Sequence, residues 1–294
     1  MTTKRKAAKS ATAARKSAKR SAQATLSIAT SKQRSVKERV AALAAAPLAV
    51  TENDKSLQAV LTVLRNKTEP VAVRLAALQS LAAAAFSVVT FASCRTDYIA
   101  TLREVADDPD PEIRKRVLGL LAREKDGFAQ KKLLEGLKNP EKALVPPDKA
   151  LQLLGNDPHA EAYAAARAIV RKPPSDVARR EALRLLAADA TSAPMFEKLL
   201  RDKNELREIR QISASALQTL QPARLQAAAR DVLLDESEYD DIRATSLSAL
   251  TNFGDDAAIA DDKPLLKSVD RISGGKASTK YKQDARRFLS KYGR

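Results

Sequence analysis

The chain has 294 residues, of which 44% are hydrophobic and 30% charged, and its net charge at neutral pH is +16. No uninterrupted apolar run reaches the ~18 residues that a membrane-spanning helix needs, and the single cysteine, Cys94, cannot form an intrachain disulfide. We therefore expect no transmembrane segment and a reducing compartment. The cytoplasm is the location we expect, with the nucleoid or the nucleus as alternatives.

The N-terminal segment, residues 1–34, contains ten Lys or Arg and no acidic residue. It has almost nothing apolar to bury and its like charges repel, so we predict that it is a disordered tail. Its candidate phosphate-binding side chains are Lys4, Arg5, Lys6, Lys9, Arg15, Lys16, Lys19 and Arg20. Their composition resembles the lysine- and alanine-rich tails of linker histones, which implies salt-dependent binding of nucleic acid without base recognition. A targeting peptide, a lipid-binding segment and a purely solvating tail are the alternatives.

Six later segments repeat one pattern, in which an anchor residue is followed by small or apolar side chains three, four, six and seven positions later. The anchors are Arg74, Arg114, Pro147, Arg179, Arg210 and Arg243, at spacings of 40, 33, 32, 31 and 33 residues. These offsets place the apolar side chains on one face of a helix, and a period of this length is typical of stacked repeats. A second helical stretch lies between successive anchors, so each repeat is predicted to be a pair of antiparallel helices.

Two blocks of this pattern carry a family resemblance. Asp108–Arg114 with the apolar residues after it, and Tyr239–Arg243 with those after it, resemble the centre of a HEAT repeat. The resemblance implies an all-α fold, a right-handed α-solenoid of about six to seven HEAT-like helix pairs over residues 35–262. It departs at Pro147, which replaces Arg, and at the lengthened gap that contains Ser87–Arg95, where we expect irregular stacking.

The resemblance also implies a role for the anchor arginines. In HEAT proteins such residues bond to acidic groups of their own or the neighbouring unit, which makes them structural repeat anchors. Here Asp110, Asp176 and Asp240 or Asp241 are the acids expected to serve Arg114, Arg179 and Arg243.

The C-terminal extension, residues 263–294, carries ten Lys or Arg against two acidic residues. Between the two basic ends the chain holds 32 basic and 34 acidic residues, so the repeat body is nearly neutral. The last helix is predicted to cap the array with outward cations, which form a second candidate nucleic-acid site: Lys282, Arg286, Arg287 and Lys291. In the body, cationic pairs such as Lys131-Lys132 recur near repeat junctions and would favour nucleic-acid binding if they shared one face.

Catalytic patterns are missing from the sequence. His159 is the only histidine, so no multi-histidine metal site is possible, and we expect no metal, no cofactor and no catalytic residues. HEAT-repeat deoxyhypusine hydroxylases hold two irons with His-Glu pairs, which this chain lacks. HEAT-like alkylpurine DNA glycosylases bind DNA in a basic, aromatic-lined groove, whereas this chain has no tryptophan and a nearly neutral body. Nothing in the sequence excludes the third such group, the HEAT-like phycobilin lyases.

Two functions remain. The first is a non-enzymatic scaffold or adaptor that binds a protein partner through the solenoid surface, with basic termini that contact nucleic acid. The alternative is a sequence-independent DNA- or RNA-binding HEAT protein, and a HEAT-like enzyme such as a DNA glycosylase ranks last. The near-neutral body decides this order, because a groove that wraps DNA should concentrate cations along the repeats.

Overall fold

The computed structural model of the chain describes residues 23–45, 50 and 53–293. Within these residues the structure consists of helices, turns and loops, with no β-strand. The helices form antiparallel pairs that stack in sequence order, so the prediction of an all-α fold of HEAT-like helix pairs is confirmed. The chain divides into two compact units, residues 1–146 and 147–294.

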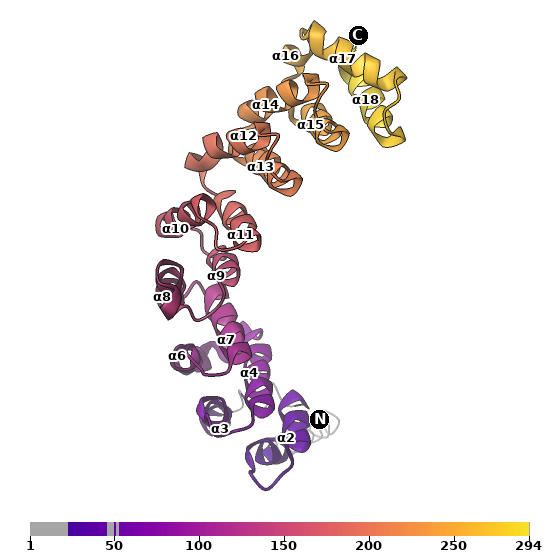
Figure 1. Ribbon diagram of the computed structural model, residues 1–294. Coiled ribbons are helices and arrows are strands. Elements are labelled where there is room, and N and C mark those ends of the chain that lie inside the picture. The colour runs from indigo at the N-terminus through magenta and orange to yellow at the C-terminus, as the bar shows by residue number, and fades with distance from the viewer. Residues whose placement is uncertain (1–22, 46–49, 51–52, 294) are drawn as a thin grey trace, which may run out of the picture. The chain divides into compact units, whose positions relative to one another are not determined.

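The first unit begins, within the described part of the chain, with a helical segment at residues 23–30. It continues with α2 (Val36–Ala45), α3 (Asp54–Arg65), α4 (Val71–Ala85), α5 (Val88–Phe91), the 3-10 helix η2 (Ala92–Cys94), α6 (Arg95–Val105), α7 (Pro111–Arg123), α8 (Gly127–Lys138) and η3 (Pro140–Lys142). Figure 1 shows two layers in this unit: α3, α6 and α8 lie in one, and α2, α4 and α7 lie in the other. The apolar faces of the helices meet between the two layers.

The second unit repeats this arrangement. It contains α9 (Pro147–Leu154), α10 (Ala160–Arg171), α11 (Asp176–Leu186), the 3-10 helix η4 (Ala190–Ser192), α12 (Ala193–Arg201), α13 (Arg207–Leu220), α14 (Pro222–Leu234), α15 (Asp240–Phe253), α16 (Asp256–Ala260), α17 (Lys263–Gly274) and α18 (Thr279–Tyr292). The helices α11, α13, α15 and α18 pack side by side in one layer (Figure 1). We call the corresponding layer of each unit, which carries the anchor residues, the anchor layer.

Local chemistry sets where the helices begin. Asp110 accepts hydrogen bonds from the backbone N–H groups of Glu112 and Ile113 at 3.0 and 2.9 Å, and Pro111 occupies the first position of α7. Ser175 caps α11 in the same manner through Ala178, at 3.1 Å. Such caps satisfy N–H groups that lack a partner inside the helix, and proline fits the first turn because it has no N–H to satisfy.

The anchor arginines occupy one position in their helices. Arg74, Arg114, Arg179, Arg210 and Arg243 are each the fourth residue of their helix. The alignment of Pro147 with them is wrong, because Pro147 is the first residue of α9 and the fourth is Ala150, which is buried. The sequence pattern also missed Arg39, the fourth residue of α2 and likewise buried.

The lengthened gap after α4 forms a corner of its own. Its extra residues fold into α5 and η2, where Phe91 and Cys94 are buried and the Phe91 ring meets Tyr98 edge to face, at 5.3 Å between centroids. The expected irregularity at this point is therefore present, and Cys94 packs as an apolar side chain.

Helices form at both basic ends of the chain. Residues 23–30 form a helix in which Leu26 and Ala29 are buried, so this part of the predicted tail contributes to the first unit. At the other end, α17 and α18 pack as a helix pair and α18 also packs on α15, which continues the stack. In both places a few apolar side chains within a basic segment are enough to dock a helix.

Among the described residues, no single helix is long and apolar enough to cross a membrane. One bent pair, Val71–Ala85 with Val88–Val105, passes that test of length and composition, with an angle of 115° between its parts.

Candidate interaction surfaces

The anchor arginines are held within the protein by two kinds of bond. The first is a hydrogen bond from Nε to the backbone carbonyl ten residues earlier, as from Arg74 to Leu64 at 2.9 Å and from Arg210 to Leu200 at 2.8 Å. Arg39 makes the same bond to Ala29, at 3.0 Å. Each of these side chains thereby ties its own helix to the preceding helix of the repeat.

The second bond joins four arginines at this helical position to a carboxylate of the following repeat. The pairs are Arg39–Glu69, Arg74–Asp108, Arg179–Glu205 and Arg210–Glu238. Each carboxylate lies two or three residues before the next helix of the anchor layer. We call these pairs the rungs of an Arg–carboxylate ladder.

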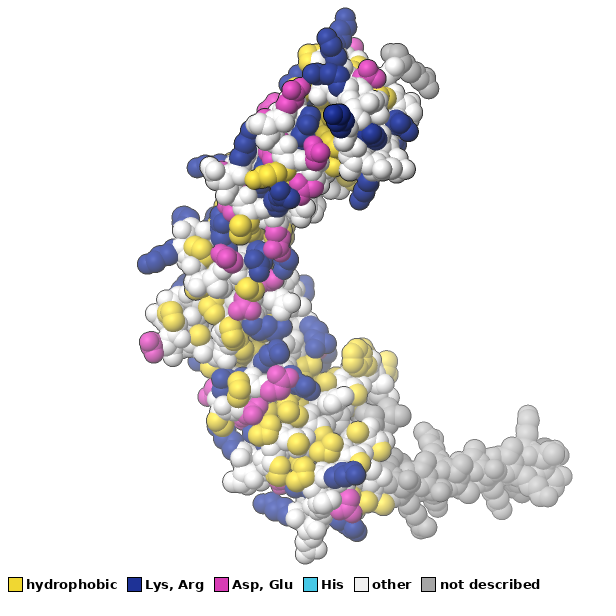
Figure 2. All heavy atoms as spheres, turned by 45° about the vertical axis from the view of Figure 1, so that its right-hand side comes forward, with side chains coloured by type: hydrophobic (Ala, Val, Ile, Leu, Met, Phe, Trp, Pro, Cys, Tyr) yellow, Lys and Arg dark blue, Asp and Glu magenta, His cyan; other side chains and the backbone are white. Residues whose placement is uncertain are grey.

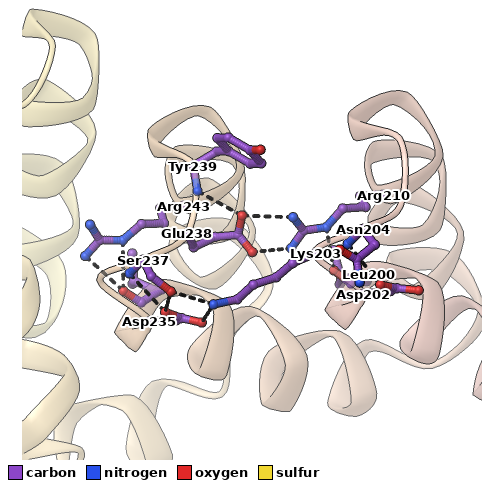
Figure 3. A network of polar contacts seen from close by, with 11 residues as sticks. Leu200, Asp202, Lys203, Asn204, Arg210, Asp235, Ser237, Glu238, Tyr239 and Arg243 are labelled. Carbon is purple, nitrogen blue, oxygen red and sulfur yellow. Dashed lines mark hydrogen bonds and ion pairs between the residues drawn. The ribbon is translucent and has the colours of Figure 1, made fainter.

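The rung between Arg210 and Glu238 is buried on both sides, with side-chain exposures of 0% and 2%. Figure 3 shows the guanidinium facing both carboxylate oxygens, with Nη1 at 2.8 Å from Oε1. The hydrogen bonds from Arg210, together with one from the backbone N–H of Tyr239, hold the pKa of Glu238 below its usual value despite burial. In the first unit, burial alone would raise the pKa of Asp108, but hydrogen bonds from Arg74 and from the Asp110 N–H lower it further than burial raises it. These groups maintain the stacking and are not free to bind a ligand.

The acids expected from the sequence to serve the anchors were mostly wrong. Arg179 pairs with Glu205 of the next repeat instead of Asp176, and Arg114 bonds to the carbonyls of Leu144, Asp108 and Pro109. The sequence pattern could not reveal Glu205. It aligns equivalent positions of different repeats but does not show which side chain of one repeat contacts which side chain of the next, and each rung is such a contact.

Arg243 is the other anchor without a buried carboxylate. It bonds to the Leu233 carbonyl at 3.2 Å and lies 3.9 Å from Asp240, one of the two acids expected for it, which is 66% exposed. The residues before α18, where the next carboxylate would lie, are Lys276 and Ala277. The ladder therefore ends at α15.

The candidate residues of the N-terminal tail, Lys4 to Arg20, lie outside the described residues, so their predicted role stays a prediction. The four C-terminal candidates do not act alike. Lys282 is the fourth residue of α18, the anchor position, and is half-buried, whereas Arg286 and Arg287 are exposed. Lys291 is engaged with Asp256 at 3.0 Å and with the Thr251 carbonyl at 3.1 Å, so it fastens the last helix to α15 and α16.

Further cations surround Arg286 and Arg287 in the second unit. Six exposed side chains of α17, α18 and their connection make no ion pair with any described residue: Lys263, Lys267, Lys276, Lys280, Arg286 and Arg287. We call them the C-terminal cationic cap, and Figure 2 shows Lys and Arg side chains gathered at this end of the unit. Because no described carboxylate compensates them, these charges are available to an anion.

The basic residues of the repeat body are mostly compensated. Arg116 contacts Glu112 at 2.7 Å, Arg180 contacts Glu208 at 3.4 Å, and Lys203 pairs with Asp235. Lys115 and Lys132 likewise have carboxylates within 4 Å, and they come from helices of different layers. This compensation gives no support to a cationic ridge along the repeats.

A groove follows the anchor layer of the second unit. It encloses about 710 Å³ and is lined by residues from α13, α15 and α18 and from the turns that precede the last two helices: Arg207, Gln211, Tyr239, Asp240, Asp241, Ala244, Thr245, Ser248, Ser278, Lys280, Tyr281 and Asp284. We call it the α13–α15–α18 groove. Three consecutive anchor-layer helices thus contribute side chains to one surface.

Two tyrosines, Tyr239 and Tyr281, line this groove and differ in exposure. Tyr239 is 50% exposed, and the Arg207 guanidinium lies over its ring at 4.0 Å while it also contacts Asp241 at 3.3 Å. Tyr281 is buried, and its hydroxyl has no hydrogen-bond partner among the described residues. Burial raises the pKa of Tyr281 to about 12. The hydroxyl is therefore a neutral donor without an acceptor at neutral pH.

The corner after α4 exposes apolar side chains in the first unit. Phe86, Val88 and Val89 are 83%, 71% and 90% exposed, and we call these three residues the apolar knob. A hollow of about 450 Å³ lies beside it, lined by Gln79, Ala82, Ala83, Ala85, Phe86, Tyr98, Leu120, Arg123 and Glu124. From the sequence this gap is expected only to be irregular, although two adjacent valines, Val88 and Val89, outside the repeat pattern are a usable signal of an exposed apolar surface.

Comparison with known proteins gives no family for this chain. No protein-family model matches the chain, and no curated protein matches its sequence. Human deoxyhypusine hydroxylase in complex with glycerol is similar at 16% identity over 83% of this chain and 97% of that chain, with a TM-score of 0.35. The complex of CpcE and CpcF of phycocyanin lyase from Nostoc sp. PCC7120 is similar at 14% identity over 86% of this chain and 94% of that chain, with a TM-score of 0.40.

These similarities correct one expectation, that the chain is not an enzyme. Deoxyhypusine hydroxylase is an enzyme, and one fold can serve both enzymes and binding proteins. At 16% identity the similarity gives this chain no activity either. Among the described residues, no group of three His, Cys, Asp or Glu is placed to hold a metal ion.

Proposed function

We propose that the chain is a scaffold that binds a protein partner along the α13–α15–α18 groove. The observation that carries this proposal is the exposed Tyr239 ring with Arg207 stacked on it, within a groove built by three successive helices. Tyrosine and arginine are enriched among the residues that dominate binding energy in protein interfaces, and stacked repeats present extended surfaces of this kind.

The rim of the groove indicates the chemistry of the partner segment. Asp240, Asp241 and Asp284 line it together with Arg207 and Lys280, and Arg207 already compensates Asp241. Asp240 is 66% exposed and has only a distant contact with Arg243. A partner segment that presents lysine or arginine side chains would pair with the two remaining carboxylates, Asp240 and Asp284.

The test is partner capture followed by titration. Full-length wild-type protein, Tyr239→Ala and Phe253→Ala are used as baits, and bound proteins are identified by mass spectrometry. Phe253 is the matched control, because it is an aromatic residue of the same unit with 48% exposure and does not line the groove. A partner bound by wild type and Phe253→Ala, with affinity reduced at least about tenfold by Tyr239→Ala, supports the proposal. Partners that bind all three baits equally would place the site elsewhere.

A second function is supported by the C-terminal cationic cap. We propose that these six side chains, with Lys282 and the tail residues Lys4 to Arg20, bind the phosphates of nucleic acid without reading bases. Uncompensated cations displace counterions from a phosphate backbone, so the affinity should fall steeply with salt. Lys291 is left out of this set because it is already paired with Asp256.

Binding to labelled duplex DNA and single-stranded RNA across a salt series tests this second function. The proteins compared are full-length chain, a deletion of residues 1–22, which leaves every described helix intact, and Arg286→Gln/Arg287→Gln. For each phosphate that a variant no longer neutralises, the negative slope of log affinity against log salt should become shallower by about 0.9 on DNA. The same slope in all three proteins would refute both predicted phosphate sites.

A further inference from the structure

We propose that two copies of this chain pair through the corner of the first unit, with the apolar knob of each copy packed into the hollow of the other. This inference does not rest on the α13–α15–α18 groove or on the cationic cap, since it concerns the other unit. The occupant is a second copy of the same chain.

The first argument is the exposure of the knob. Val88 and Val89 are 71% and 90% exposed and neighbour Phe86, at 83%, so three large apolar side chains lie together in water. Single exposed apolar residues are common on protein surfaces, whereas contiguous ones mark interaction sites. Elsewhere among the described residues, the exposure of large apolar side chains reaches at most 50%.

The second argument is the hollow beside the knob. Its walls include Ala82, Ala83 and Ala85 of α4 and Leu120 of α7, and a volume of about 450 Å³ admits side chains of the size found on the knob. The small alanine side chains leave room where larger residues would fill the gap between the two helices. Most of the lining is apolar, so the hollow can receive an apolar side chain, while Gln79, Arg123 and Glu124 are its polar residues.

The position of these two features selects a second copy as the occupant. Phe86 belongs to both the knob and the wall of the hollow, so the projection and the receptor lie side by side on one surface. In a dimer with two-fold symmetry both copies contribute the same surface. The knob of the first copy can then enter the hollow of the second while the knob of the second enters the hollow of the first. A different partner would need only one of the two features.

The charges on the rim of the hollow agree with self-pairing. Arg123 and Glu124 are adjacent and opposite in sign, and Arg95 also contacts Glu124. A surface that carries both signs attracts a copy of itself when unlike charges are brought together. The net charge of +16 on each chain opposes association at long range, but at physiological salt this repulsion is screened beyond about 8 Å.

The experiment is sedimentation velocity of the full-length protein at physiological salt, from about 1 to about 200 µM, because association of copies depends on concentration. We expect a monomer–dimer equilibrium in wild type. Val88→Asp/Val89→Asp should raise the dimer dissociation constant at least about tenfold, since each charge would have to be buried in an apolar hollow. Ala83→Glu should do the same from the receptor side, at an exposed helical position that accepts glutamate.

Val177→Asp is the matched control, because Val177 is 46% exposed on α11 of the second unit. It should dimerise like wild type. Circular dichroism verifies that each variant keeps its helices. If Val88→Asp/Val89→Asp misfolds, Ala83→Glu still tests the proposal. A wild type that is monomeric over the whole range, or a dimer unaffected by both the knob and the receptor variants, would overturn the proposal.

Discussion

Arg210 and Arg243 belong to consecutive anchor-layer helices of the second unit and occupy the same helical position, yet their surroundings differ. Arg210 is fully buried against Glu238, whereas Arg243 is 11% exposed and has only Asp240 within 4 Å. Both bond to the carbonyl ten residues earlier. The helix that carries the arginine therefore fixes one bond, and the residue before the next helix decides whether a buried ion pair forms.

This difference separates two contributions to stability. The carbonyl bond holds a repeat together, and the carboxylate bond holds one repeat to the next. A buried charge that loses its partner is costly, while an exposed one remains hydrated. Substitutions of Arg210 and Arg243 therefore form a matched pair.

The largest effect is expected from Arg210→Met. Glu238 would remain buried without a countercharge, which should lower the free energy of unfolding by about 3–5 kcal/mol. Urea denaturation followed by circular dichroism measures the loss. Arg210→Met/Glu238→Met, which leaves no buried charge, should recover a large part of it. A double variant as unstable as the single one would show that the stability comes from another feature of the site.

A smaller effect is expected when acid removes the charge without removing the side chain. The folded-state pKa values of Glu238 and Asp108 are lowered, the first mainly by hydrogen bonds from Arg210. Their stabilisation is therefore present above the unfolded-state values of about 4.3 and 3.9 and is lost as the pH falls through the lower folded-state values. Denaturation between about pH 7 and pH 3 should show a decline that begins near pH 4. Arg210→Met/Glu238→Met should decline less steeply, and equal slopes would contradict this assignment.

Arg243→Met should cost less than Arg210→Met. It removes the hydrogen bonds to the Leu233 carbonyl but leaves no buried carboxylate, since Asp240 is 66% exposed. We expect a loss of about 1–2 kcal/mol, the cost of a buried acceptor without its donor. The comparison with Arg210→Met under identical denaturation conditions is the measurement. Equal losses for the two variants would mean that the carboxylate of the rung contributes nothing specific.

The smallest effect is a gain. Ala277 lies two residues before α18, as Glu238 lies two residues before α15. Ala277→Glu should supply the missing carboxylate to Arg243 and raise the free energy of unfolding by about 0.5–1 kcal/mol, the range of a partly exposed ion pair. Ala277→Gln controls for side-chain size. A gain that is the same for both substitutions would have to be attributed to helix propensity or packing.

Much of the fold followed from the periodic pattern. The spacing of apolar residues after Arg114 and Arg210, with turn residues such as Asp110 and Pro111 between them, defined the helices and their pairing because these signals are local. The alignment of α9 with the other repeats was wrong because Pro147 was matched to the anchor arginines. The residue at the anchor position of α9 is Ala150, whose small side chain does not stand out in the sequence. The docked helix at residues 23–30 was missed because its few apolar residues are diluted by a basic composition.

The interaction surfaces were much less accessible to sequence reasoning. The C-terminal cations were recognised by composition, but only their contacts show that Lys291 is paired and that Arg286 and Arg287 are not. The stacking of Arg207 on Tyr239 joins two residues 32 positions apart in sequence, and no local pattern predicts that contact.

The sequence by itself determined the helix-pair repeat, the positions of the anchor arginines and the basic character of both ends, because periodicity, capping and composition are properties of neighbouring residues. Only the tertiary structure decided which carboxylate completes each rung, where the ladder ends, and that Phe86, Val88 and Val89 stay exposed beside a hollow. Those features depend on distances between side chains of successive repeats, and these distances are set by helix packing.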